Sequence, residues 1–365
     1  MWTRSGHVRH SVHCVRRVFP GATRQIGARN ASRTAVVLDI DGVVTRGATA
    51  VPGAAEALRR LRQQQIPFVF MTNGGGVTEK KKAEELCSLL GVDGIDADRM
   101  LLSHTPFRPL AERFREKRVL LVGSKDTAEV AESYGFDVGN MAVTSSQIVK
   151  ALPEIYPWPV THCTLPPVDV NAADAPPIEA VLIFYWPSDW AMELQAVVDD
   201  MQVVSDVLAG GRPLGVGTTG TNGTGVQCAE LWSSNPDFLW QAGYPVPRFG
   251  TGAFVECLQA LWKPFGRSPL EVQECGKPYA VQFQAARKLL SQLAQHDDFE
   301  RIYMIGDNPA ADVRGANSAG DPWRSILVCT GVYQGGVGSN DKEDPAWRVE
   351  ENLPDAVESI LRMSG

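Results

Sequence analysis

The sequence predicts an α/β fold, a doubly wound parallel-sheet core into which a second α/β segment is inserted. Short apolar runs of strand length alternate with stretches whose apolar residues recur every three or four positions, as expected for strands alternating with helices. The runs end abruptly at Gly, Asp, Asn or Thr, which favour turns. The alternation is regular near both ends of the chain and irregular in the middle, so one core is expected to be split around an insert.

The expected core comprises residues 34–105 and 264–365. Its strands are short buried runs that end at turn residues: 35–41, 67–71, 100–103, 301–305 and 325–329. Its helices run through Leu58 and Leu61, from 78 to 90, from Pro278 through Leu293, and from 354 to 362. The helix after Pro278 carries one buried apolar stripe.

The insert is expected to cover residues 106–263. Its regular elements are strands at 119–122 and 179–185 and a helix from 188 to 208 with a single buried face. Residues 151–177 contain seven prolines, which predicts a long surface loop.

The charge balance argues against nucleic acid as a partner. The 365 residues carry a net charge of −7, and residues 1–33 hold seven Arg but no Lys, Asp or Glu. The remaining chain therefore holds 28 basic and 42 acidic residues, a net charge of −14. Phosphate contacts need Lys and Arg, so a body this acidic is a poor nucleic-acid binder.

The Arg-rich, acid-free segment 1–33 has the composition of a mitochondrial transit peptide, with a disordered basic tail as the alternative. We therefore expect a mitochondrial matrix protein. No run of about 18 uncharged apolar residues exists, so no membrane span is predicted. Seven scattered Cys without a Cys-x-x-Cys pair argue against a disulfide scaffold or a zinc site.

Two carboxylates mark the end of the first expected strand. Asp39 and Asp41 lie two positions apart and so share one side, at the carboxyl end where open α/β sheets bind ligands. Two close anions repel, so either a hard cation such as Mg²⁺ or a shared proton must compensate them. A solvated pair of carboxylates in a turn is the alternative.

A second acidic turn follows the expected strand at 301–305. Asp307 and Asp312 supply a third and a fourth carboxylate there. Carboxylates that converge from distant strand ends at one sheet edge are typical of an octahedral Mg²⁺ site. The candidate metal ligands are therefore Asp39, Asp41, Asp307 and Asp312.

Thr72 also ends an expected strand. Its hydroxyl, together with the backbone N–H groups of Asn73 and the following glycines, is a candidate site for phosphate oxygens. Lys277 stands just before an expected helix start, among groups that would bind an anion. The alternatives are ordinary turn chemistry for Thr72 and Asn73 and a solvated side chain for Lys277.

Together, these segments resemble the motifs of the haloacid dehalogenase (HAD) superfamily of aspartyl-nucleophile phosphohydrolases. The matching segments, in chain order, are Asp39-x-Asp41-Gly, Thr72, Lys277 and Gly-Asp307-Asn-x-x-x-Asp312. The insert lies between the second and third motifs, which resembles class IIA, the subgroup with a large α/β cap. The resemblance implies a HAD-like, Rossmannoid catalytic core at 34–105 and 264–365 and a substrate-specificity cap at 106–263.

Further segments are similar to those of the cat-eye-syndrome critical region protein 5 family, also described as haloacid dehalogenase-like hydrolase domain-containing 5. Members of that family are regarded as mitochondrial. The segments span about residues 35–335 and are 102–106, 179–184, 234–237, 247–250, 276–278 and 326–333.

The superfamily resemblance implies a mechanism. Asp39 would attack phosphorus and form an aspartyl-phosphate, while Asp41 would protonate the leaving group and then activate water. Thr72 and Lys277 would hold the phosphoryl oxygens. Mg²⁺ would be held by Asp39, the backbone carbonyl of Asp41, Asp307 and, directly or through water, Asp312.

The implied function is a Mg²⁺-dependent phosphatase for a small phosphorylated metabolite. Haloalkanoate dehalogenases of the superfamily lack the second acid, so Asp41 favours phosphoryl transfer. A catalytically weak binding or scaffold protein and a phosphotransferase or phosphomutase remain open. Arg248, beside Phe249, is a candidate cap residue for substrate contact, with a surface ion pair as the alternative. Caps of this kind often carry dimer contacts, so a homodimer is one expected assembly.

Overall fold

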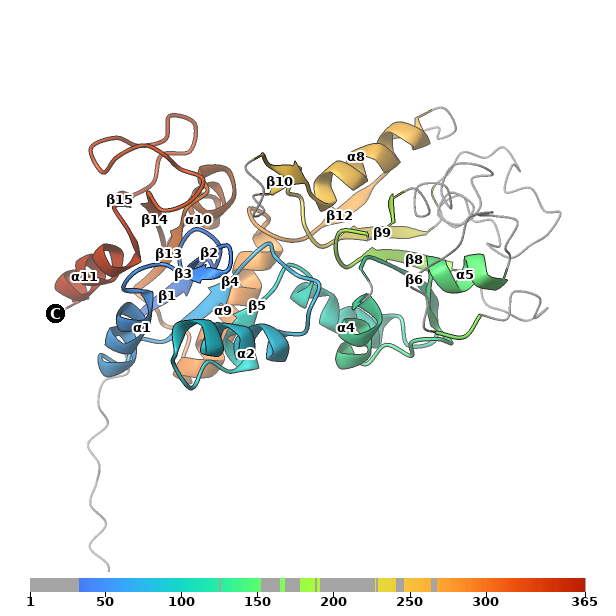
Figure 1. Ribbon diagram of the computed structural model, residues 1–365, viewed down its shortest axis with the longest axis horizontal. Helices are drawn as coiled ribbons and strands as arrows, with labels where there is room; N and C mark the ends of the chain where they lie inside the picture. Colours follow the sequence, from blue (N-terminus) through green and yellow to red (C-terminus); the bar gives the residue numbers. More distant parts are fainter. Residues whose placement is uncertain are drawn as a thin grey trace, which may run out of the picture. The chain divides into compact units, whose positions relative to one another are not determined.

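Six parallel strands form the sheet of the core in this computed structural model (Figure 1). In order along the sheet, they are β15 (Arg348–Glu350), β14 (Trp323–Val328), β13 (Arg301–Gly306), β1 (Thr34–Leu38), β4 (Phe68–Met71) and β5 (Met100–Leu101). β1 lies between β13 and β4, and later strands are added outward on both sides of it. Such a point of reversal opens a crevice at the carboxyl ends of the strands.

The structure describes only part of the chain. The described residues are 33–124, 126–151, 165–167, 178–187, 189–190, 227, 229–240, 246–263 and 268–364. Most of the predicted 188–208 helix, of the 151–177 loop and of the 1–33 segment therefore lies outside them. Among the described residues, no helix is long and apolar enough to cross a membrane.

Helices cover both faces of the core sheet, which explains why its strands are apolar on both sides. One face lies against α1 (Ala54–Gln63), α2 (Glu79–Leu90) and α11 (Leu353–Ser364). The other face lies against α9 (Ala280–Ala294) and α10 (Arg314–Ala319). Successive residues of β1 alternate between the two faces, as a strand requires.

The insert forms a second parallel sheet with helices on both faces. Its strands are, in order, β12 (Val272–Glu274), β9 (Glu230–Ser233), β8 (Ile178–Ile183), β6 (Arg118–Val122) and β7 (Ala142–Thr144). One face packs against α5 (Ser145–Ala151) and α8 (Thr251–Trp262), and the other against α3 (Arg108–Arg113) and α4 (Thr127–Tyr134).

Short elements complete the described chain. Two β-hairpins are formed by β2 (Thr45–Arg46) with β3 (Thr49–Ala50) and by β10 (Leu239–Trp240) with β11 (Arg248–Phe249). The helical turns are η1 (Ala97–Arg99), η2 (Thr105–Phe107) and η4 (Pro309–Val313).

The predicted α/β fold with a parallel core sheet is confirmed. The end of the insert differs from the sequence prediction, because β12 pairs with β9 in the second sheet although it lies beyond residue 263. The three residues of β12 alternate in exposure and form no apolar run, so only their tertiary pairing reveals the strand.

Candidate active site

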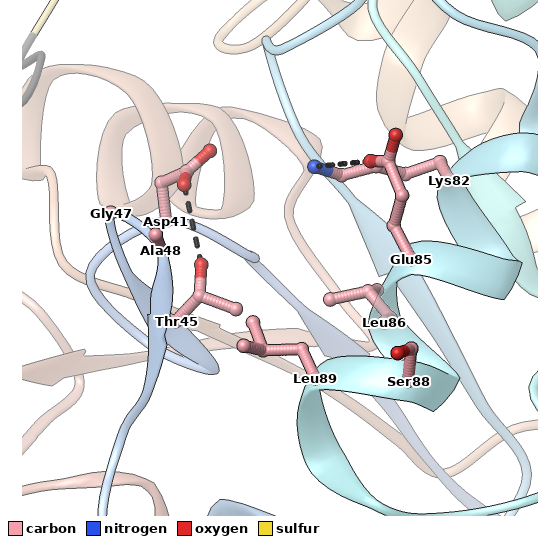
Figure 2. A pocket seen from close by; sticks show the side chains of 9 residues that line it. All are labelled: Asp41, Thr45, Gly47, Ala48, Lys82, Glu85, Leu86, Ser88 and Leu89. Carbon is pink, nitrogen blue, oxygen red and sulfur yellow. Dashed lines mark hydrogen bonds and ion pairs between the residues drawn. The ribbon is translucent and has the colours of Figure 1, made fainter.

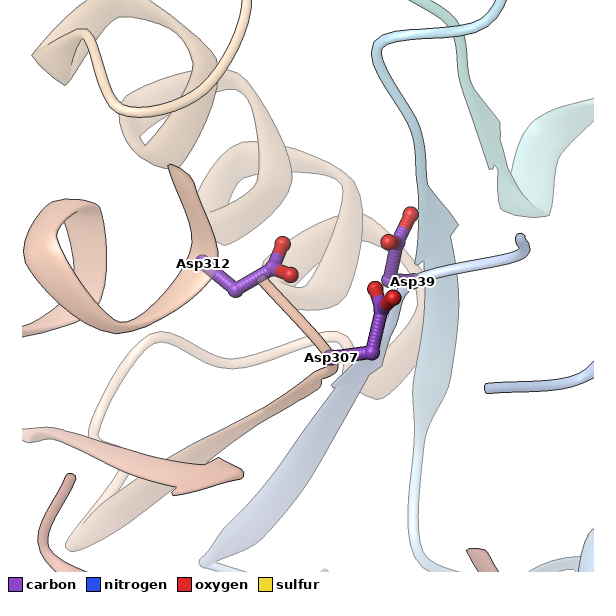
Figure 3. Close-up of side chains that lie close together, drawn as sticks. All are labelled: Asp39, Asp307 and Asp312. Atoms are coloured by element: carbon purple, nitrogen blue, oxygen red, sulfur yellow. The ribbon is translucent and has the colours of Figure 1, made fainter. Parts of the chain in front are cut away.

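Three carboxylates meet at the carboxyl ends of β1 and β13 (Figure 3). Asp39 follows β1 and Asp307 follows β13, and these strands are parallel neighbours with Leu38 opposite Ile305. Asp312 comes from the turn η4. One oxygen from each carboxylate lies within 4.8 Å of the others, and each residue is at most 6% exposed. The structure thus brings together three of the four carboxylates that the sequence singled out.

Lys277 carries a positive charge into this cluster. Its Nζ lies 2.8 Å from Asp39 Oδ1 and 2.6 Å from Asp312 Oδ1, and the residue is buried. Burial alone would lower the pKa of Lys277, but Asp312 and Asp39 outweigh it and raise that pKa. The ammonium therefore stays charged, and the alternative of a solvated lysine is wrong.

The cluster holds more negative than positive charge. Burial raises the pKa of Asp39 well above its usual value, against the attraction of Lys277. Burial and the neighbouring Asp312 raise the pKa of Asp307 to about 6. When all three carboxylates are ionised, they exceed the single ammonium by two negative charges. Buried carboxylate oxygens with this charge excess fit a divalent hard cation such as Mg²⁺.

Asp39, Asp307 and Asp312 would hold such a cation. The ion would compensate the charge of the carboxylates and of a phosphoryl group bound beside them.

Two glycines let the backbone approach Asp307 closely. A Cβ placed on Gly331 would lie 1.8 Å from Asp307 Oδ2, and one on Gly42 would lie 2.3 Å from it. The N–H of Val332 donates to the same oxygen at 2.6 Å. A larger residue at either glycine would therefore push Asp307 out of the cluster. Neither glycine had a predicted role.

Asp41 lies apart from the three-carboxylate cluster. Its side chain is exposed, and its Oδ1 accepts a hydrogen bond from Thr45 Oγ1 at 3.3 Å (Figure 2). It lines a pocket of about 480 Å³ between the β2–β3 hairpin and α2. Its Oδ2 lies 3.8 Å from the Cβ position of Gly74, which places the carboxylate beside the loop that follows β4. An exposed carboxylate at this position is suited to exchanging protons with a substrate.

Thr72 and Asn73 differ in how their side chains are engaged. Thr72 is buried, and its Oγ1 accepts a hydrogen bond from the N–H of Gly74 at 2.9 Å. Asn73 Oδ1 accepts from the N–H of Lys277 at 2.7 Å, and Asn73 Nδ2 donates to the C=O of Lys277 at 2.9 Å. The Asn73 side chain therefore fixes the backbone of Lys277. Its predicted contribution to phosphate binding rests on its backbone N–H.

The segment after β9 brings two further residues to this loop. Asn235 Nδ2 donates to the C=O of Asn73 at 2.8 Å, and Asp237 Oδ1 accepts from Asn73 Nδ2 at 3.0 Å. Burial raises the pKa of Asp237, while its bond with Asn73 and the charge of Lys277 act against that rise. Neither Asn235 nor Asp237 had a predicted role. The available signal was their position, since polar residues directly follow a strand end.

Arg248 lies on β11, opposite Trp240 of β10, and is exposed. The hairpin that carries it begins two residues after Asp237. Its contact with a substrate stays a prediction.

Comparison with known proteins decides the family. Residues 36–137 match the haloacid dehalogenase-like hydrolase family and residues 274–356 match the HAD-hydrolase-like family. The chain is 32% identical over 357 residues to a mitochondrial hydrolase of Saccharomyces cerevisiae, covering 90% of this chain and 96% of that protein. The chain belongs to the haloacid dehalogenase-like hydrolase family.

A second relative of this HAD hydrolase is a fusion protein. It is the cardiolipin synthase (CMP-forming) / mitochondrial hydrolase fusion protein of Schizosaccharomyces pombe, 34% identical over 330 residues. The alignment covers 88% of this chain and 52% of the fusion protein, so the chain spans about half the length of that relative.

Solved structures share the fold of this HAD hydrolase. A hypothetical protein of Pyrococcus horikoshii superposes with a TM-score of 0.62 at 18% identity, covering 90% of this chain and 99% of that one. The glycerol phosphate phosphatase of Mycobacterium tuberculosis, in complex with magnesium, superposes with a TM-score of 0.57 at 19% identity. The superposition covers 89% of this chain and 76% of that one. These structures show the fold alone; the family models and the yeast relative confirm the predicted resemblance to the HAD superfamily.

Proposed function

We propose that this HAD hydrolase is a Mg²⁺-dependent phosphatase that acts on a small phosphorylated metabolite. The observation that carries the proposal is the buried cluster in which Lys277 contacts Asp39 and Asp312 beside Asp307. Its charge excess suits a divalent cation, and its position at the end of β1 suits an anionic substrate. The phosphatase and magnesium named for the Mycobacterium tuberculosis structure support the same assignment.

Each residue has a role in the proposed reaction. Asp39 attacks phosphorus and forms an aspartyl-phosphate, as its place in the cluster allows. Asp41, exposed outside the cluster, gives a proton to the leaving group and then takes one from water. Lys277 and Thr72 hold the phosphoryl oxygens, and bound Mg²⁺ supplies compensating charge. The carboxylates Asp39, Asp307 and Asp312, with the backbone carbonyl of Asp41, are the proposed ligands.

The setting of the reaction is part of the proposal. The two relatives with mitochondrial names support a mitochondrial location, and the Arg-rich segment 1–33 supports import to the matrix. Residues 106–263 are proposed as the substrate-specificity cap. One relative carries a cardiolipin synthase in the same chain, so the substrates tested should include a phosphorylated lipid.

The test is phosphate release by the purified full chain from a panel of phosphate esters, with Mg²⁺ and with chelator. We expect metal-dependent release that falls at least 1,000-fold in Asp39→Asn, since the nucleophile is lost (on the order of 10³ or more for a covalent-catalysis residue). Asp298→Asn is the matched control, because Asp298 is exposed and precedes β13 at the opposite edge of the sheet. Retained hydrolysis in Asp39→Asn would refute the mechanism. Phosphate transfer to an added alcohol instead of water would favour the phosphotransferase alternative.

A further inference from the structure

The loop after β14 reaches the turn that carries Asp41. In the core sheet, β13 lies between β14 and β1, so the end of β13 separates the residues that follow the two outer strands. Nevertheless, Thr330 Oγ1 donates a hydrogen bond to the C=O of Gly42, which directly follows Asp41. The loop therefore crosses the end of β13, where Asp307 lies.

The turn and the loop meet backbone to backbone at two glycines. A Cβ on Gly42 would lie 3.0 Å from Gly331 Cα, and one on Gly331 would lie 2.8 Å from Gly42 Cα. The same loop fixes Asp307. The N–H of Val332 donates to its Oδ2 at 2.6 Å, and the N–H of Tyr333 donates to its C=O at 2.9 Å. The turn after β1 is thus packed against the loop that holds a proposed metal ligand.

Hydrogen bonds connect this junction to the carboxylate of Asp41. Arg46, on β2, donates from Nε to the C=O of Thr330 at 3.0 Å, beside the bond from Thr330 to Gly42. The N–H of Gly42 donates to the C=O of Thr45 at 2.7 Å. Thr45 Oγ1 in turn donates to Asp41 Oδ1 at 3.3 Å (Figure 2). A continuous path of hydrogen bonds therefore runs from Thr330 to Asp41.

The position of Asp41 depends on this turn because its exposed side chain is little restrained by packing. A general acid must lie within hydrogen-bond reach of the atom that it protonates. We propose that Thr330 is a positioning residue, which holds the turn so that Asp41 gives its proton to the leaving group. The inference rests on the proposed phosphatase function and deepens it.

The leaving group of the substrate separates this role from a general structural one. p-Nitrophenolate departs without a proton, whereas ethoxide needs one, so ethyl phosphate depends more strongly on Asp41 in the first chemical step. The value of kcat/KM reports that step, because it does not include hydrolysis of the aspartyl-phosphate. The ratio of kcat/KM for the two esters cancels changes in their shared phosphate site. Both are measured with the purified full chain at saturating Mg²⁺.

Thr330→Val removes the hydroxyl and should lower kcat/KM for ethyl phosphate roughly 10- to 100-fold, the effect of a misplaced acid. For p-nitrophenyl phosphate, kcat/KM should fall less than about threefold, because no proton is needed. Arg46→Gln changes an exposed residue and removes the bonds from its guanidinium to Thr330. It should show the same preference, as should Asp41→Asn.

Two variants control for the change of side chain. Thr330→Ser keeps the hydroxyl and should retain the native ratio. Thr144→Val is the matched control, because Thr144 ends β7 in the second sheet and its hydroxyl donates to Gln147 Oε1 at 3.2 Å. It loses a comparable hydrogen bond and should leave both kcat/KM values unchanged.

Hydrogen exchange of the amides of residues 42–45 should be faster in Thr330→Val than in the native chain, because the turn opens more often. Faster exchange with an unchanged ratio, or an equal loss of kcat/KM for both esters, would overturn the inference while leaving the phosphatase intact. If the native chain hydrolyses neither ester, the proposed function fails and the inference fails with it.

Discussion

Replacing Lys277 with Met removes the ammonium that contacts both Asp39 and Asp312. At an effective dielectric constant of about 20, the contacts at 2.8 and 2.6 Å each represent roughly 6 kcal/mol of gross attraction. Desolvation of the buried lysine cancels several kcal/mol of this, and the carboxylates of the variant take up protons. We therefore expect Lys277→Met to lower the free energy of unfolding by about 3–5 kcal/mol near pH 7.5, in chelator.

The loss should depend on pH in a fixed direction. Without Lys277, the pKa of Asp39 rises further above that of an unfolded Asp, so ionised Asp39 destabilises the fold most at high pH. Protonation removes that penalty. The difference between variant and native protein should therefore shrink as the pH falls from 8 towards 5.

Urea unfolding at several pH values, with and without Mg²⁺, checks both expectations. Mg²⁺ should stabilise Lys277→Met more than the native chain, because the variant leaves an additional negative charge uncompensated. Lys82→Met is the control, since Lys82 lies 3.8 Å from an exposed Glu85, and it should cost less than about 1 kcal/mol. A loss below about 1 kcal/mol for Lys277→Met, or a loss that grows at low pH, would refute the reasoning.

Three further predictions address the surroundings of the cluster. Gly331→Ala should weaken Mg²⁺ binding, measured by calorimetry, at least tenfold, because the new Cβ would collide with Asp307 (roughly the effect of losing a residue that orients a metal ligand). The control Gly336→Ala should leave binding unchanged, because its Cβ would meet nothing within 4 Å. Asn73→Ala leaves the backbone N–H and C=O of buried Lys277 without their Asn73 partners and should cost about 2–4 kcal/mol in urea unfolding. A cost below about 0.5 kcal/mol would contradict the role of Asn73 in fixing this backbone. Burial lowers the pKa of His104 to about 4, so its contribution to stability is complete above about pH 6.5 and is lost as the pH falls towards 4, up to about 3 kcal/mol. In His104→Phe, the free energy of unfolding should fall by up to about 3 kcal/mol less between pH 6.5 and pH 4 than in the native protein. An identical pH profile would contradict the lowered pKa of His104.

The carboxylate cluster could be predicted because its residues stand at the ends of individual strands, where the sequence alone reveals them. Asp39 and Asp307 each follow an apolar run directly, and parallel neighbouring strands bring such ends together. The role of Asn73 could not be predicted in this way. Its bonds to the backbone of Lys277 join residues 204 positions apart, and an Asn followed by glycines is also normal turn chemistry. The position of β12 was likewise fixed by a partner strand and not by its own three residues.

Asn73 also explains how substrate choice and chemistry can be separated in this hydrolase. Its side chain contacts the backbone of Lys277 on one side and Asp237 on the other, so Asn73 holds both the backbone of Lys277 and the segment after β9. Phe238, Leu239 and Trp240, which directly follow Asp237, are exposed. Substitutions there can change which leaving group fits without moving Lys277. Substitutions at Asn73 should instead alter the backbone of Lys277 and the segment after β9 together, so Asn73→Ala should lose affinity for phosphate esters whatever their leaving group.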